Sequence, residues 1–184
     1  MSFQTNEQTI LRELDTVLGK IDQEQVDRAM EVIRASDKIF FHALGRAAFA
    51  GKSFVMRLMH MGREVYVVGE TNTPNFGSND LLIICSGSGE TSQFVEIANK
   101  AKKLGGTVMV FTATPDSTLD RLSDASIVIQ APSKKQEDSL FHSVQPMASL
   151  FEQGILIAGD AIILSLMEGQ TGNDEMFQRH SNLE

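Results

Sequence analysis

The chain has 184 residues, a length that fits one domain, and its 42% hydrophobic and 22% charged residues are typical of a globular protein. Its 24 acidic and 16 basic side chains give a formal net charge of −8, which repels phosphate backbones and argues against a nucleic-acid partner. The single cysteine, Cys85, excludes an internal disulfide and fits a reducing compartment. Because the first residues lack the pattern of a secretory signal, we expect a cytoplasmic protein.

Two amphipathic helices are predicted at the N-terminus, over about residues 5–35. Apolar residues from Ile10 to Leu18 recur at helical spacing, and those from Val26 to Ile33 repeat the pattern after a short break. The first helix has few partners within a small α/β core. We therefore expect it to lie across a neighbouring subunit, together with the charged C-terminal tail at about 170–184.

Five short apolar segments, mostly separated by helices, predict the strands of a sheet at about 38–43, 65–68, 80–85, 107–111 and 127–129. Helices are expected at about 48–61, 91–104, 119–122 and 147–169. The strands are apolar on consecutive positions, which indicates that both faces of the sheet are covered. The pattern therefore predicts one domain over 1–184, a three-layer α/β/α sandwich around a five-stranded parallel sheet.

Two further segments stand out in the second half of the chain. Residues 131–142 are polar and predict a loop of about a dozen residues, a length that favours a functional lid. Residues 147–167 form a long apolar stretch that Glu152 and Asp160 interrupt. Because a charge at the centre of a bilayer is costly, we interpret this stretch as a core helix and expect no membrane partner.

The sharpest motif, Ser86-Gly87-Ser88-Gly89-Glu90-Thr91, joins a buried strand to a helix. Its glycines allow a tight turn with exposed amides, its hydroxyl groups can donate hydrogen bonds, and the start of the helix adds roughly half a positive charge. These features predict a phosphate-binding loop. A plain connecting turn with a helix cap is the alternative interpretation.

The kind of phosphate follows from what the motif lacks. No lysine follows its final glycine, and it does not have the three-glycine spacing of a dinucleotide site, so a phosphomonoester fits best. A phosphate would repel Glu90, which is therefore expected to face the sugar portion of a ligand or to bind backbone. The four histidines are scattered and no cluster has metal-ligand spacing, so we expect no metal.

Several blocks of the chain resemble the 6-phospho-3-hexuloisomerases, enzymes made of a single sugar isomerase (SIS) domain with a flavodoxin-like fold. The blocks are MRLMHMG at 56–62, VVGET at 67–71, SGSGET at 86–91, QPMASLFEQ at 145–153 and the tail through His180, Asn182, Leu183 and Glu184. The resemblance spans nearly the whole chain. It implies interconversion of 3-hexulose 6-phosphate and fructose 6-phosphate in the ribulose monophosphate pathway of formaldehyde fixation, by a homotetramer.

The turn after the first strand departs from this family. The family usually has a glycine, a small residue and then Gly-Arg-Ser-Gly, whereas the chain reads Ala43-Leu44-Gly45-Arg46-Ala47-Ala48. Gly45 and Arg46 remain and are expected to contact the substrate. Losing a hydroxyl that binds substrate costs on the order of 1 kcal/mol in affinity, so a reduced or shifted specificity is expected.

The implied reaction moves a carbonyl between two neighbouring carbons through an enediol, which requires a general base and no redox cofactor. Glu152 is the candidate base, because burial in an apolar helix favours a raised pKa and the resemblance places this glutamate at the active site. Asp160, eight residues later, lies on nearly the same helix face and is a rival. The resemblance adds His60 and His180 as catalytic histidines, one of them supplied by a neighbouring subunit.

Two other functions compete with this hypothesis. The altered turn keeps open another aldose-ketose isomerase of the SIS family that acts on a sugar phosphate. A non-catalytic module that binds sugar phosphates is the second alternative, because SIS domains also occur in transcription regulators. About 35 residues precede the first strand, which is too few for an added DNA-binding domain, and their acidic character is the wrong charge for one.

Overall fold

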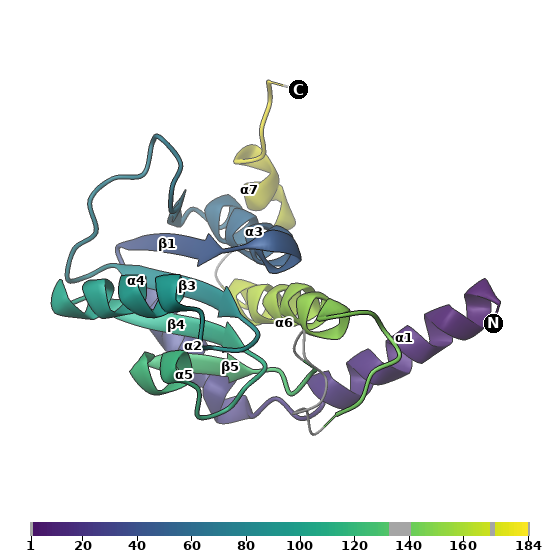
Figure 1. The fold of residues 1–184 in the computed structure, drawn as a ribbon. Helices are drawn as coiled ribbons and strands as arrows, with labels where there is room; N and C mark the ends of the chain where they lie inside the picture. The colour runs from purple at the N-terminus through teal and green to yellow at the C-terminus, as the bar shows by residue number, and fades with distance from the viewer. Residues whose placement is uncertain (1, 133–140, 170–171, 184) are drawn as a thin grey trace.

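The computed structural model describes residues 2–132, 141–169 and 172–183 (Figure 1). Its strands are β1 (Lys38–Ala43), β2 (Glu64–Val67), β3 (Leu81–Ser86), β4 (Thr107–Thr112) and β5 (Ala125–Val128). Its helices are α1 (Phe3–Leu18), α2 (Gln23–Ala35), α3 (Gly45–His60), α4 (Ser92–Lys103), α5 (Thr118–Leu122), α6 (Ser149–Met167) and α7 (Asn173–Gln178).

The five strands form one parallel sheet in the order β2-β1-β3-β4-β5, which is the flavodoxin-like order. One face of the sheet packs against α2, α3 and α6 around residues such as Phe41, Ile83 and Phe111. The other face packs against α4 and α5 around residues such as Phe40 and Ile84. Successive strand residues therefore enter opposite cores, and the predicted three-layer sandwich is confirmed.

Helix boundaries differ from the prediction in two places. Helix α3 begins at Gly45, three residues earlier than expected, since Gly45 adopts a φ of 61° and turns the chain directly from β1 into the helix. No helix was predicted in the charged C-terminal tail, but the tail contains α7. Buried Met176 anchors this short helix against α3, although the sequence around it is largely polar.

Helix α6 is long and apolar enough to cross a membrane, with a mean hydropathy of 1.6 and half of its most apolar window buried in the fold. Helix α6 contributes Phe151, Ile155 and Ile162 to the core on the sheet face that α2 and α3 also cover, and α3 packs along α6. Its apolar composition is therefore used in packing against the sheet, as the prediction of a core helix requires.

Helix α1 has one buried and one exposed part. Leu14 and Val17 are buried against α6, whereas Phe3 and Leu11 are 77% and 57% exposed. The N-terminal part of α1 extends away from the body of the molecule (Figure 1). Most of the predicted lid at 131–142 lies outside the described residues.

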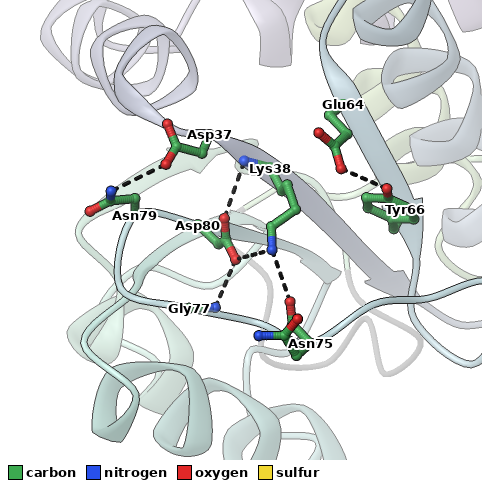
Figure 2. A network of polar contacts seen from close by, with 8 residues as sticks. All are labelled: Asp37, Lys38, Glu64, Tyr66, Asn75, Gly77, Asn79 and Asp80. Carbon is green, nitrogen blue, oxygen red and sulfur yellow. Dashed lines mark hydrogen bonds and ion pairs between the residues drawn. The ribbon is translucent and has the colours of Figure 1, made fainter.

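A network of polar contacts joins the amino ends of β1 and β3 (Figure 2). Asp80 is only 3% exposed, and its carboxylate accepts hydrogen bonds from the Lys38 and Gly77 amides at 3.2 and 2.7 Å. Lys38 Nζ lies 3.1 Å from Asp80 Oδ2 and also donates to the Asn75 carbonyl. Because both carboxylate oxygens have partners, Asp80 fixes the loop before β3 to the start of β1.

Candidate active site

The carboxyl ends of β1 and β3 form the point at which the sheet changes its winding direction. From β1 the chain proceeds to β2 on one side, and from β3 it proceeds to β4 on the other. In an open parallel sheet this switch point leaves a crevice in which ligands bind. Gly45 and Arg46 follow β1, and the loop at 86–91 follows β3, so the two predicted substrate-binding segments lie side by side at this crevice.

The loop at 86–91 is held by its own hydroxyl groups and by the segment after β4. Ser86 Oγ accepts a hydrogen bond from the Gly89 amide at 3.2 Å, and Ser88 Oγ accepts one from the Glu90 amide at 3.3 Å. The Gly87 carbonyl accepts from the Ala113 amide at 3.1 Å. The loop is thus shaped before any ligand arrives, which reduces the entropy cost of binding.

Gly89 and Glu90 connect the loop to α5. Gly89 has a φ of 65°, and a Cβ on it would come within 2.0 Å of Ser117 Oγ, so glycine is required there. The Glu90 carboxylate accepts 2.7 Å hydrogen bonds from the Thr118 amide and Thr118 Oγ1. These bonds lower the pKa of Glu90. Of the two orientations expected for Glu90, the structure has the one that binds backbone.

The helices that leave this edge begin without side-chain caps. The N-cap residues are Leu44 for α3 and Thr91 for α4, and neither side chain accepts a hydrogen bond from its helix. The first amides of such a helix point outward without an intrahelical partner. Two helix N-termini that attract anions therefore face the switch point, with the Thr91 side chain at the start of α4.

Glu152 lies at the same edge, in the first turn of α6. Its Oε2 is 2.6 Å from Arg46 Nε, and the exposed fractions of the two side chains are 15% for Glu152 and 67% for Arg46. A Cβ built on Gly87 would lie 3.4 Å from the ring of Phe151, so the 86–91 loop packs beside the residue that precedes Glu152. The structure therefore brings together the predicted base, Arg46 and the 86–91 loop.

His42 and Gln93, which no motif in the sequence indicated as site residues, lie at this edge as well. His42 Nε2 is 3.4 Å from Gln93 Nε2, and the His42 ring packs edge-on against Phe94 of α4. Burial lowers the pKa of His42, which favours the neutral ring. The sequence could have indicated His42 by its position, because it is the second-last residue of the first predicted strand and the turn after that strand was predicted to contact substrate.

His60 and His180 lie elsewhere in the protomer. Their rings stack with centroids 5.3 Å apart, and both line a cavity of about 410 Å³ between α3, α6 and α7. His60 is the last residue of α3 and Arg46 is in its first turn, so the helical rise places them about 21 Å apart along the helix axis. One protomer therefore does not bring the two histidines to Glu152.

The environment of His60 disfavours protonation of its ring. His60 is 3% exposed, and its Nδ1 lies 3.2 Å from Arg57 Nη1. Burial, the Arg57 charge and His180 all lower the pKa of His60. Asp160, the rival of Glu152, lines this same cavity and not the switch point, so the tertiary structure separates the two carboxylates.

The structure also bears on cysteine chemistry and on metal binding. Cys85 is buried in β3, and burial raises the pKa of its thiol, so this residue packs in the core. Within residues 2–132, 141–169 and 172–183, no three His, Cys, Asp or Glu side chains are grouped to hold a metal ion.

Similarity to other proteins covers nearly the whole chain. Residues 32–157 match the model of the SIS domain family. The 3-hexulose-6-phosphate isomerase of Bacillus subtilis is 43% identical, over 95% of each chain, and that of Mycobacterium gastri is 38% identical, over 98% of this chain and 91% of the relative.

A solved structure from Methanococcus jannaschii, described as implying the function of 3-hexulose-6-phosphate isomerase, superimposes with a TM-score of 0.83. It is 29% identical to this chain, and the match covers 98% of this chain and 99% of that one. The chain belongs to the SIS domain family and, within it, to the 3-hexulose-6-phosphate isomerases.

Proposed function

We propose that the chain is an isomerase that interconverts 3-hexulose 6-phosphate and fructose 6-phosphate in the ribulose monophosphate pathway. The observation that carries this proposal is the similarity along nearly the full length to isomerases of that name, up to 43% identity. A carboxylate beside two uncapped helix N-termini at the switch point is the arrangement that such chemistry needs.

The reaction exchanges a carbonyl and a hydroxyl group between C2 and C3 and is redox-neutral overall. Starting from fructose 6-phosphate, a base removes the proton on C3, the electrons of that bond form the C2–C3 double bond, and the π electrons of the C2 carbonyl move to its oxygen, which gives the enediolate form of the enediol. A proton then returns to C2, and the proton of the C3 hydroxyl moves to the C2 oxygen. The enzyme must therefore hold the phosphate and place one carboxylate over these carbons.

We assign phosphate binding to the backbone amides and hydroxyl groups of 86–91, with Ser86, Ser88 and Thr91 as the hydroxyl donors. The shaped loop and the N-terminus of α4 support this assignment. Glu90 acts through Thr118, holding the loop against α5 rather than contacting phosphate. Gly45 gives close access to the start of α3, because no side chain projects from it.

Glu152 is the proposed general base, and Arg46 is the residue that an anionic substrate meets first. The Arg46 side chain is mostly exposed, so a phosphate or sugar oxygen competes for it with Glu152. An Arg46 that turns to the substrate leaves the Glu152 carboxylate available for the C–H proton. Ala47 supplies no hydroxyl group that could bind the sugar here.

The proposed mechanism takes His60 and His180 from a neighbouring subunit, because the two histidines lie far from Glu152 within one protomer. We propose a homotetramer in which the N-terminal helices and the C-terminal tail make subunit contacts. Its interfaces would cover large exposed apolar side chains, among them Phe3 on α1, Phe49 on α3 and Leu164 on α6. A cytoplasmic location agrees with the unpaired thiol of Cys85.

An assay with purified protein tests the proposal. Formation of fructose 6-phosphate from 3-hexulose 6-phosphate is expected, with no turnover of arabinose 5-phosphate, while light scattering gives four chains per particle. Turnover of arabinose 5-phosphate alone would establish the other isomerase. If neither compound reacts but fructose 6-phosphate raises the melting temperature, the protein is a binding module.

A further inference from the structure

A carboxylate on α1 contacts the segment that leads into α6. Glu13 Oε2 accepts hydrogen bonds from Ser143 Oγ at 2.6 Å and from Gln145 Nε2 at 2.9 Å, and Glu13 Oε1 accepts one from the Val144 amide at 2.9 Å. Three successive residues, separated from Glu13 by about 130 positions, are thus held by one side chain. Glu13 also lies outside residues 32–157, which match the SIS domain model.

The segment after these residues forms a short and strained turn. The Ser149 amide donates to the Pro146 carbonyl at 3.2 Å, and Met147 between them has a φ of 57°. A residue other than glycine holds such a conformation only when surrounding contacts impose it. Because only residues 146–148 separate Gln145 from the first residue of α6, the position of Gln145 constrains where α6 begins.

The first turn of α6 needs such support. Ala148, its N-cap residue, has no side chain that can accept a hydrogen bond from the helix, so the first amides of α6 lack a cap. Uncapped first turns fray, and Glu152 lies in this turn. Its contact with Arg46, at 2.6 Å, requires a defined position of the backbone.

We propose that Glu13 is a positioning residue for the isomerase reaction, which latches residues 143–145 and thereby holds the first turn of α6 with Glu152 in its reactive position. The inference rests on the proposed function of Glu152. It makes α1 part of the catalytic machinery without any contact between Glu13 and the substrate. Burial disfavours the Glu13 anion, but the bonds from Ser143, Gln145 and Val144 outweigh burial and lower the pKa of Glu13.

The test compares Glu13→Ala and Glu13→Gln with Glu7→Gln, a control at an exposed glutamate of the same helix. In Glu13→Ala we expect kcat to fall roughly ten- to hundredfold, because a small misplacement of a reacting group has effects of that size. KM should change less than about threefold, since the phosphate loop is untouched. Glu13→Gln keeps one acceptor oxygen for Val144 and should lie between wild type and Glu13→Ala.

Two further measurements separate positioning from loss of fold. Hydrogen exchange should accelerate in a peptide covering residues 143–152 in Glu13→Ala but not in Glu7→Gln. Ser143→Ala should reduce kcat less on the Glu13→Ala background than in the wild type, because the Glu13–Ser143 bond is then already lost and only the bond from the Gln145 amide to Ser143 Oγ remains to be removed.

A wild-type kcat in Glu13→Ala, unchanged exchange at 143–152, or an equal loss in Glu7→Gln would each overturn the latch. Absence of isomerase activity in the wild type would overturn the proposed function instead. In that case the exchange measurement still decides whether Glu13 holds the start of α6.

Discussion

The two edges of the sheet differ in whether their polar groups have partners within the protein. At the amino edge, Asp80 satisfies the Lys38 ammonium group and two backbone amides, so this network holds the protein together (Figure 2). At the carboxyl edge, α3 and α4 start without side-chain caps. Polar groups with internal partners stabilise the fold, whereas those left available are the groups that a ligand can use.

The carboxyl edge, where the proposed base Glu152 lies, predicts the largest effect. Glu152→Gln removes the proposed base and keeps the shape of the side chain, so turnover should fall on the order of 10²- to 10⁴-fold. Binding of fructose 6-phosphate, measured by calorimetry, should change little because the 86–91 loop proposed to hold the phosphate is intact. A variant that turns over substrate at the wild-type rate would remove Glu152 from the mechanism.

At the amino edge, removal of the Asp80 network should lower stability without lowering turnover. Asp80→Ala leaves the Lys38 ammonium group without its carboxylate partner, so the free energy of unfolding should fall by about 3–5 kcal/mol in urea titrations. At temperatures where the variant is folded, kcat should equal that of the wild type.

Glu31→Ala is the matched control, because it removes the exposed ion pair with Arg28. It should cost less than about 1 kcal/mol. Equal losses in Asp80→Ala and Glu31→Ala would contradict the structural role of the buried network.

Two glycines of the 86–91 loop, which we propose binds the phosphate, allow a comparison within the carboxyl edge. Gly89→Ala places a Cβ against Ser117 at a positive φ, so it should cost about 1–3 kcal/mol and raise KM. Gly87→Ala meets the Phe151 ring only at 3.4 Å and should have a smaller effect. Thermal melts and KM values for the two variants check this order, which a reversed ranking would contradict.

The smallest expected effect concerns the pH dependence of stability. The pKa of His60 is lowered in the folded protein. In the unfolded chain the histidine has its ordinary pKa of about 6.5, so as the pH falls the unfolded chain takes up this proton before the folded protein does. His60 therefore contributes stability above that pH, and part of it is lost on acidification. The melting temperature should fall more between about pH 7.5 and pH 5.5 in the wild type than in His60→Gln; equal falls would contradict this contribution.

Much of the fold was predictable because local patterns carry it. Consecutive apolar residues in strands such as Leu81–Ser86 mark a sheet covered on both faces, and the order of strands and helices then leaves few parallel topologies. The helix α7 was missed because its sequence is largely polar and only Met176 is buried. Its docking on α3 depends on a distant surface that no local pattern encodes.

The candidate site was predictable in part for the same reason. The motif at 86–91 signals its role within six residues, since glycines, hydroxyl groups and a helix start are local features. His42 and Glu13 gave no such signal. Their importance follows from contacts with Gln93 and with Ser143, Val144 and Gln145.

The sequence by itself determined the layered α/β class, the serine-glycine motif at 86–91 and the family resemblance, because each depends on the order of residues along the chain. Only the tertiary structure decided which carboxylate meets Arg46. Glu152 and Asp160 are equivalent by helical spacing, but the packing of α6 places one beside the start of α3 and the other beside its end. Such choices depend on how whole helices pack against the sheet, and local spacing cannot fix that.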